Sequence, residues 1–316
     1  MRPIFTCGRR TAATLASLAL ATAVLPLTAC GSTSSGGDDS AIKAVASTTQ
    51  ICDYITQLAS GGQDDGLSFD RTGADGTTEH FGADTASAKT HLTLTCLLAP
   101  NASAHEHDMT AEQSKALSEA DLFFVSGVDL EHFLDDAVTS TGFKGTMVVT
   151  SGVYGAVDVD DLDAQLAKEK DLPYTVDRGS DKVEVAKWPF PPEDGESEPE
   201  FRFDPHVWTS PKNAIIQVKN IGAALEKASP ESADLLRSHT DSYIKLLTDL
   251  DDWARASLET VPAGKRVLFT SHDAFGYFSA EYGVTFKGAA LSDFNAQQDA
   301  TADKITETAK AVKASG

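Results

Sequence analysis

The sequence predicts an α/β protein built from two βα lobes with parallel sheets, which one long rigid helix joins. The first observation is the order of apolar runs and helical periods over residues 42–150, which is β-α-β-α-β-α-β. Such alternation is typical of a parallel sheet with helices on both faces. The second is a helical period of roughly 30 residues over 229–261, about 45 Å long at about 1.5 Å per residue. The third is a new strand–helix series that begins near residue 266, so we expect the helix to span two lobes.

The first 29 residues are predicted to be a lipoprotein signal peptide and no part of the fold. Three arginines precede the apolar run 15–27, which is too short and too rich in alanine for a membrane span. The run ends in Leu27-Thr28-Ala29-Cys30-Gly31, which looks like a bacterial lipobox. We therefore expect Cys30 to be lipidated and to anchor the protein to the outer face of the cytoplasmic membrane. Residues 30–40, rich in Gly, Ser and Asp, are expected to form a flexible tether.

Composition and charge limit the kind of partner. The chain has 316 residues, of which 41% are hydrophobic, and a formal net charge of −21. This length and apolar content suffice for a sizeable core. Such a negative charge argues against binding to nucleic acid or to anionic lipid. It suits a protein that handles cations, and the lipid anchor is the only membrane contact that we expect.

Four cysteines are present, and two of them are expected to form a disulfide. Cys7 is lost with the signal peptide and Cys30 is the anchor, so Cys52 and Cys96 remain in an exported, disulfide-permissive compartment. Cys52 opens the first helix, and Cys96 lies on a strand expected to pair beside the preceding one, which could bring their Cα atoms within about 7 Å. Neither has a cysteine or histidine nearby at the spacing of a zinc finger, so we prefer a disulfide to metal ligation.

The first lobe is assigned to residues 41–228. Ser47-Thr48-Thr49 is expected to cap its first helix. Residues 61–89 have no period and are predicted to be a loop insertion in which His80 is solvated, and 158–203 are predicted to be an irregular acidic loop. The strands are expected at residues 42–46, 91–98, 122–125 and 147–150. The first helix is expected to have Ile51, Ile55 and Leu58 on its apolar face, and further helices are expected at 109–120, 130–138 and 211–227.

Residues 229–261 are assigned to the linking helix and 262–316 to a second lobe. The apolar residues of the helix recur at spacings of three to seven, so one stripe is expected to face a core. Pro262 and Gly264 end the helix, and a strand follows at 266–270. Only two βα units fit into the rest of the chain, so we expect this lobe to be incomplete and the chain to be a fragment. The stripe consists of Leu236, Tyr243, Leu246, Leu250, Trp253 and Leu258.

Three histidines have surroundings that suit metal ligands. His206 lies in Asp204-Pro205-His206-Val207-Trp208, where the carboxylate can hold the second ring nitrogen, as is usual for metal-binding histidines. Ser210-Pro211 follows, with the character of a helix N-cap and proline at the first helical position. His105 and His272 each come just after a predicted strand, and ligands of parallel sheets sit outside the carboxyl ends of strands. We favour one site that contains all three imidazoles over separate core or surface roles.

Several runs together carry a resemblance to a known family. Asp204-Pro205-His206-Val207-Trp208 and Ser271-His272-Asp273-Ala274-Phe275-Gly276-Tyr277-Phe278 are its most specific parts, and the segment 120–127 with Leu130-Glu131 adds to them. Over about residues 41–316, the sequence resembles the metal-binding lipoproteins of bacterial ABC importers for zinc and manganese. The resemblance implies a C-clamp, in which two lobes and a rigid helix hold one metal ion in the cleft between the lobes.

The resemblance also implies the metal ligands, which are His105, His206 and His272. The match is looser around His105, because the family has a proline before this histidine and an aromatic residue two positions after it. This chain has Ala104 and His107 there, so His107 stays open as an alternative first ligand.

Acidic residues near the site raise two further expectations. Asp204, Asp273 and Glu106 adjoin the histidines and are expected to orient them. The family's fourth ligand is an acidic residue late in the second lobe, and no position here matches it; Asp293 and Asp299 are fallback donors. We therefore expect a longer form of the chain to bind zinc more tightly.

The expected function is capture of a metal ion outside the cytoplasm. Three neutral imidazoles suit Zn²⁺, whereas Mn²⁺ would be better served by carboxylates. The resemblance implies a monomeric solute-binding subunit that delivers Zn²⁺ to the permease of an ABC importer, which works with its ATPase. The alternatives are a metal-binding adhesin or other surface lipoprotein and a zinc hydrolase with a three-histidine site. We do not expect an enzyme, because the nearby acids look like partners of the ligands and not like a general base.

Overall fold

The computed structural model describes residues 41–60, 66–190, 192, 197–199, 201–270, 272–289 and 302–314. The expected signal peptide (1–29) and tether (30–40), with Cys30, lie outside the described residues, and so do Asp293 and Asp299. None of the helices in the described ranges is long and apolar enough to cross a bilayer.

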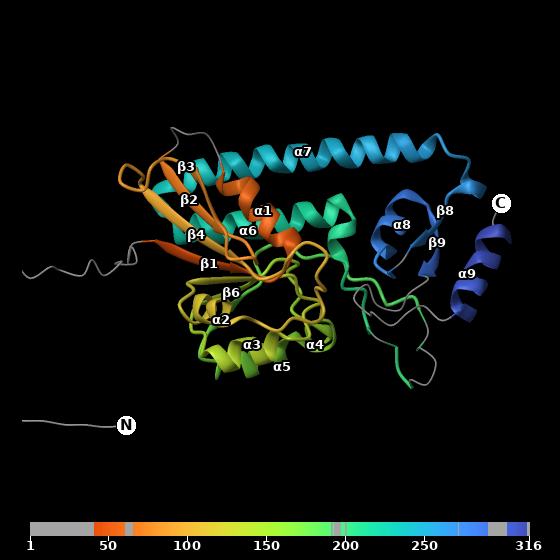
Figure 1. The fold of residues 1–316 in the computed structure, drawn as a ribbon, viewed down its shortest axis with the longest axis horizontal. Coiled ribbons are helices and arrows are strands. Elements are labelled where there is room, and N and C mark those ends of the chain that lie inside the picture. Colours follow the sequence, from red (N-terminus) through yellow and green to blue (C-terminus); the bar gives the residue numbers. More distant parts are fainter. Residues whose placement is uncertain are drawn as a thin grey trace, which may run out of the picture. The chain divides into compact units, whose positions relative to one another are not determined.

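A seven-stranded sheet forms the larger part of the fold (Figure 1). Its strand order is β3-β2-β4-β1-β5-β6-β7, and every neighbouring pair is parallel except β2 with β3. Parallel neighbours require crossover connections, which the helices supply. The predicted α/β class is therefore confirmed. The strands are β1 Ile42–Ala46, β2 Leu67–Thr72, β3 Thr78–Gly82, β4 Thr90–Cys96, β5 Leu122–Val125, β6 Thr146–Val149 and β7 Thr175–Asp177.

The central strands face two different cores. In β1, Ala44 and Ala46 belong to one core and Val45 to the other, because successive strand side chains point to opposite faces. Helices α1, α6 and α7 cover the first face, and α2 and α3 cover the second (Figure 1). These helices are α1 Thr49–Ala59, α2 Ala111–Ser118, α3 Leu134–Thr141, α6 Pro211–Ala228 and α7 Ala233–Glu259.

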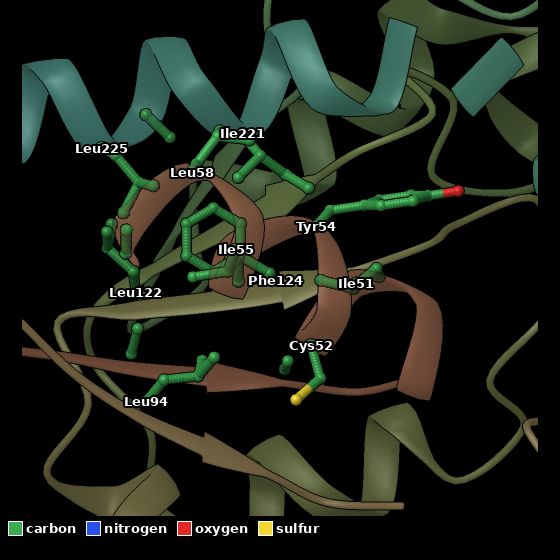
Figure 2. Close-up of a cluster of buried hydrophobic side chains, with 14 of the residues drawn as sticks. Ile51, Cys52, Tyr54, Ile55, Leu58, Leu94, Leu122, Phe124, Ile221 and Leu225 are labelled. Carbon is green, nitrogen blue, oxygen red and sulfur yellow. The ribbon is translucent and has the colours of Figure 1, made fainter. Parts of the chain in front are cut away.

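Helix α1 is held by a cap, an apolar face and a disulfide. The side chain of Thr48 accepts a hydrogen bond from the N–H of Ile51 at the start of the helix. Ile51 and Leu58 are fully buried, and Figure 2 shows the apolar side of α1 packed between the sheet and α6. Cys52 is joined to Cys96 of β4, with the two Cα atoms 5.7 Å apart. This is the pairing that the sequence suggested.

The prediction of a plain loop over residues 61–89 is wrong, because β2 and β3 form an antiparallel hairpin there at the edge of the sheet. Leu67 and Phe69 of β2 are fully buried. The residues of β3 are mostly exposed, so its sequence shows no apolar alternation. His80 of β3 is exposed, as expected, and its Nδ1 lies 2.7 Å from a carboxylate oxygen of Asp70.

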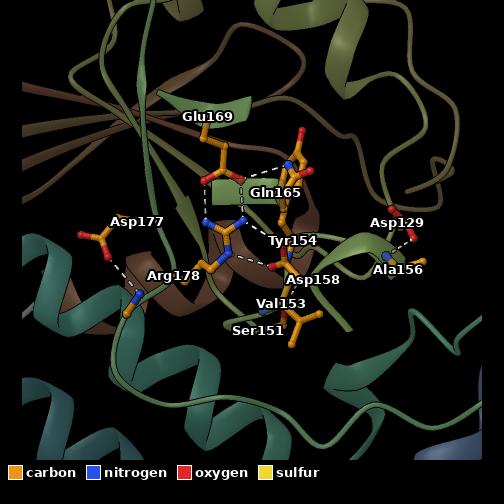
Figure 3. Close-up of polar contacts among 11 residues, drawn as sticks. Asp129, Ser151, Val153, Tyr154, Ala156, Asp158, Gln165, Glu169, Asp177 and Arg178 are labelled. Atoms are coloured by element: carbon orange, nitrogen blue, oxygen red, sulfur yellow. Dashed lines mark hydrogen bonds and ion pairs between the residues drawn. The ribbon is translucent and has the colours of Figure 1, made fainter. Parts of the chain in front are cut away.

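The prediction of an irregular acidic loop over 158–203 is also wrong in part. Arg178 is only 9% exposed at its side chain, and its guanidinium donates to the carboxylates of Asp158 and Glu169, which are 4% and 10% exposed (Figure 3). These charges fix two short helices to the edge strand β7. No apolar period marks this segment, because buried ion pairs organise it. The elements are α4 Ala156–Asp160, α5 Leu162–Glu169 and β7 Thr175–Asp177.

The long helix α7 has 27 residues, so it is about 40 Å long at about 1.5 Å per residue. It ends at Glu259, two residues before the end of the predicted range 229–261. It begins later than expected, because a short 3₁₀ turn, Pro230–Ser232, precedes it. Helix α6 starts as predicted, with Ser210 as its N-cap and Pro211 as its first residue.

Only the first part of the apolar stripe predicted along α7 packs against a core. Leu236 is buried in the core of the large sheet and Tyr243 is packed against it; Leu247, which the predicted stripe did not include, is buried there too. Leu246, Leu250 and Trp253 are 63%, 46% and 67% exposed. The spacing was compatible with one continuous stripe, but the contacts with this core end at Leu247, so the later residues gain no burial from it.

A two-stranded parallel sheet follows α7. Glu281 of α8 accepts hydrogen bonds from Lys212 of α6 and from Arg255 of α7. The hydroxyl of Tyr282 donates to buried Asp251 of α7 at 2.8 Å. These polar contacts fix α8 against both helices. The elements are β8 Val267–Thr270, α8 Gly276–Tyr282, β9 Thr285–Ala289 and α9 Ala302–Ala314.

Candidate metal centre

His105 lies in the loop after β4, and both its main chain and its ring are held. Its N–H donates to Ser103 Oγ at 3.1 Å, and its Nδ1 lies 3.1 Å from the carbonyl oxygen of Leu130. A carbonyl oxygen can only accept, so Nδ1 carries the proton and Nε2 keeps a free lone pair. Burial, followed by the charge of the nearby His206 imidazole, lowers the pKa of His105 to about 3. The ring is therefore neutral near pH 7, and neutral imidazole is the form that binds metal.

His206 is held by the carboxylate of Asp204. One oxygen of Asp204 accepts from both the N–H of His206, at 3.0 Å, and its Nδ1, at 2.9 Å. Both residues are 1% exposed. Helix α8 contacts the same carboxylate closely, since a Cβ on Gly276 would lie 2.2 Å from Asp204 Oδ2. The hydroxyl of Tyr277 in α8 donates to the carbonyl of Asp204 at 2.9 Å, so this helix helps to hold the orienting acid.

His272 lies in the turn after β8. Its carbonyl accepts from Thr270 Oγ1 at 2.6 Å and from the N–H of Ala274 at 2.9 Å. Its Nε2 lies 3.1 Å from Nε2 of His206. Because Nδ1 of His206 donates to Asp204, Nε2 of neutral His206 is an acceptor, and Nε2–H of His272 is then the donor. A metal ion bound by both nitrogens would replace this shared proton.

The three imidazoles meet in one group. One ring nitrogen from each of His105, His206 and His272 lies within 4.8 Å of the others. In the part of the chain that the structure describes, no other group of three or more histidine, cysteine or acidic side chains comes so close together. The group borders a cavity of about 440 Å³, to which Gln50 and Asn101 also contribute.

Aromatic rings surround the histidines. The ring of Phe201 has its centroid 5.1 Å from that of His105. Trp188 and Trp208 lie 5.9 Å and 5.4 Å from the ring of His206. Apolar walls exclude water and strengthen the interaction between a cation and its ligands.

The structure places the other residues singled out from the sequence differently. His107 has its Nε2 3.0 Å from the side-chain oxygen of Gln113 and is not in the group of three. The expectation that Glu106 orients His105 is wrong. The carboxylate of Glu106 lies 3.3 Å from Nδ1 of His132, and the carbonyl of Leu130 accepts from the ring of His105 instead. Asp273 is partly buried beside His272, and its role stays a prediction.

Sequence reasoning missed part of the site's surroundings. The carbonyl of Leu130 gave no signal of its own, although Leu130-Glu131 belonged to the runs that carried the family resemblance. Trp188 and Phe201 lie in a segment predicted to be a loop. Within this segment, pairing between Lys187 and Phe203 brings the neighbouring Trp188 and Phe201 together, with their ring centroids 5.1 Å apart.

The donor set defines what the group can bind. Three imidazole nitrogens without a carboxylate among them suit zinc and other borderline transition metals better than Mg²⁺ or Ca²⁺. An α/β fold that gathers three such nitrogens from separate segments belongs to the class of metal-binding proteins.

Comparison with known proteins identifies the family. Residues 83–316 match the family model of ZnuA, the zinc-uptake complex component A, periplasmic. The chain belongs to this family, which confirms the resemblance seen in the sequence. It is 28% identical over 267 residues to the manganese-binding lipoprotein MntA of Bacillus subtilis, a match that covers 84% of this chain and 66% of MntA. It is 30% identical over 201 residues to the manganese ABC transporter substrate-binding lipoprotein PsaA of Streptococcus pneumoniae, covering 64% of this chain and 55% of PsaA.

Solved structures show the same fold. The periplasmic zinc-binding protein TroA from Treponema pallidum matches with a TM-score of 0.56 at 22% identity, over 86% of this chain and 74% of that one. Zn(II)-bound AdcA from Streptococcus pneumoniae matches with a TM-score of 0.54 at 16% identity, over 87% of this chain and 44% of that one. The chain spans less than two thirds of the length of the curated relatives named above.

Proposed function

We propose that this protein is the extracytoplasmic solute-binding subunit of a metal ABC importer and that it binds Zn²⁺ through His105, His206 and His272. The observation that supports it most is the approach of three ring nitrogens to within 4.8 Å of one another. At least two of these rings have Nδ1 engaged by an acceptor, which leaves Nε2 for the metal. The proposed activity is binding and release, not catalysis.

The partners follow from the family. The relatives MntA and PsaA are named as a manganese-binding lipoprotein and a manganese ABC transporter substrate-binding lipoprotein. By analogy, the protein hands its ion to a membrane permease that an ATPase drives. Lipidation of Cys30 would hold it at the outer face of the cytoplasmic membrane, within reach of that permease.

The division into domains is part of the same proposal. We assign residues 41–228 to the first lobe, 229–261 to the linking helix and 262–316 to the second lobe. His105 and His206 then come from the first lobe and His272 from the second. A site shared in this way couples the presence of the ion to the contact between lobes.

Zinc is favoured over manganese by the donor set. The relatives and solved structures include both manganese-binding and zinc-binding proteins by name, so membership of the family does not select the metal. Imidazole nitrogen is a good ligand for Zn²⁺, whereas Mn²⁺ prefers carboxylate, carbonyl and water oxygen. Three imidazoles therefore give a preference for zinc.

The experiment is metal analysis of protein purified without a histidine tag, followed by calorimetric competition between Zn²⁺ and Mn²⁺. We expect bound zinc, and displacement of manganese by zinc. His206→Ala should weaken zinc binding by orders of magnitude in a folded protein, and His107→Ala, whose side chain is outside the group, is the matched control. Equal zinc binding by wild type and folded His206→Ala would refute the ligand assignment.

A further inference from the structure

The loop between β5 and α3 contains three consecutive residues with left-handed backbone conformations. Gly127, Val128 and Asp129 have φ angles of 86°, 58° and 56°. Glycine adopts this region freely, but a β-branched residue such as Val128 does so rarely and at a cost of about 1–3 kcal/mol. Such strain persists only where the surrounding contacts impose it. The loop therefore has a conformation that other groups must hold in place.

The N–H groups of Val128 and Asp129 donate to the carbonyls of Val153 and Tyr154, at 2.9 Å and 3.4 Å, and the carboxylate of Glu131 holds the start of the loop. Its two oxygens accept hydrogen bonds from the N–H groups of Ser126, at 2.6 Å, and Gly127, at 3.2 Å. The hydroxyl of Ser47, which directly follows β1, donates to it at 2.6 Å. Glu131 is only 6% exposed, and burial raises the pKa of its carboxyl group. Three donors compensate for the loss of water around it.

The residues on both sides of Glu131 contact His105. The carbonyl of Leu130 accepts from Nδ1 of His105 at 3.1 Å. The N–H of His132 donates to the carbonyl of His105 at 3.0 Å. A shift of Glu131 would therefore move the main-chain groups that fix both the ring and the backbone of this histidine.

We propose that Glu131 is a positioning residue for metal capture, which holds the strained loop so that the carbonyl of Leu130 keeps the proton of His105 on Nδ1. The Nε2 lone pair then stays directed toward His206 and His272. Glu131 is not one of the three proposed ligands, and it accepts hydrogen bonds from Ser47, Ser126 and Gly127. The affinity part of this inference rests on the proposed function, whereas the tautomer part concerns the metal-free protein alone.

The test is Glu131→Gln, which keeps the shape of the side chain. If its amide oxygen accepts from Ser126 and Ser47, its NH₂ group faces the N–H of Gly127, and two donors then oppose each other. Long-range ¹H–¹⁵N NMR of metal-free protein should show His105 as the Nδ1–H tautomer in the wild type and a mixture of tautomers in the variant. Zinc affinity should fall by about 10- to 100-fold, the range for loss of a residue that supports a metal ligand.

Asp129→Asn is the matched control, because it removes the same charge from the same loop. Asparagine tolerates the left-handed conformation, and its oxygen can still accept from the N–H of Ala156, as Asp129 does at 2.7 Å. We expect its His105 tautomer to be that of the wild type and its zinc affinity to stay within about 2-fold, since neither depends on this side chain.

Ser47→Ala covers the case in which Glu131→Gln fails to fold, because it removes one of the three donors and leaves the carboxylate. It should lower zinc affinity by a smaller factor and broaden the tautomer signal of His105. A retained Nδ1–H tautomer and wild-type zinc affinity in either folded variant would overturn the inference. If the tautomer shifts in the variant but the wild type binds no metal, the positioning role stands and the proposed function fails.

Discussion

The buried His105 should make the metal-free protein sensitive to acid. Its folded-state pKa is about 3, whereas histidine in an unfolded chain has a pKa of about 6.5. Between these values the unfolded chain binds a proton that the folded protein does not, so the free energy of unfolding falls as the pH falls below about 6.5. The loss stops near the folded pKa. His105 is only 6% exposed, so solvent screens this effect little.

The magnitude follows from the difference in pKa. At about pH 4.5, two units below the unfolded pKa, protonation of this one histidine stabilises the unfolded chain by about 2.7 kcal/mol relative to the folded protein. The figure is about 1.36 kcal/mol for each pH unit. His105→Asn removes the titration, and its amide NH₂ can still donate to the carbonyl of Leu130. Urea unfolding with a chelator present should therefore show a larger loss of stability for wild type than for the variant between about pH 7.5 and 4.5, by roughly 2–3 kcal/mol. Equal losses would refute the reasoning.

Three further predictions concern other parts of the fold. Tyr277→Phe removes the hydroxyl that donates to the carbonyl of Asp204, so zinc affinity measured by competition should fall by a factor of about 3–10 with little change in melting temperature; an unchanged affinity would contradict a role of α8 in holding the site. Replacing Cys52 and Cys96 with alanine should lower the free energy of urea unfolding by about 4 kcal/mol, because the bond closes a loop of 44 residues; a loss below about 1 kcal/mol would show that the bond contributes little. Arg178→Met leaves two buried carboxylates without their cation and should cost about 3–5 kcal/mol in the same assay, with zinc binding to the folded protein unaffected.

The α/β class and the ends of several elements were predictable because their signals are local. β1, β5 and α6 are bounded by short apolar runs or by the Ser210-Pro211 start signal, and the structure places them within one or two residues of the expectation. The hairpin of β2 and β3 was not predictable, because its outer strand is exposed and carries no alternation. Helices α4 and α5 were not predictable either, because they depend on buried ion pairs with Arg178 and not on an apolar period.

The site could be predicted in part for the same reason. Asp204 and His206 are two residues apart, so their contact could be predicted from the local sequence. The partner of His105 is a main-chain carbonyl 25 residues away, at Leu130, and no side-chain pattern reports it. Glu106, which follows His105 in the sequence, was expected to orient this histidine only because the two residues are adjacent. That the three histidines come together is a structural observation, and their binding of zinc remains a prediction.

The distribution of tryptophans gives the protein an internal optical reporter. Of its three tryptophans, Trp188 and Trp208 lie against the ring of His206, and the third, Trp253, is 67% exposed on α7. Emission from the first two should respond when an ion reaches the neighbouring imidazole, and the third should be selectively quenched by iodide in the solvent. With Trp253→Phe, which removes the exposed fluorophore, the remaining emission would follow arrival and departure of the ion in real time, without any attached dye.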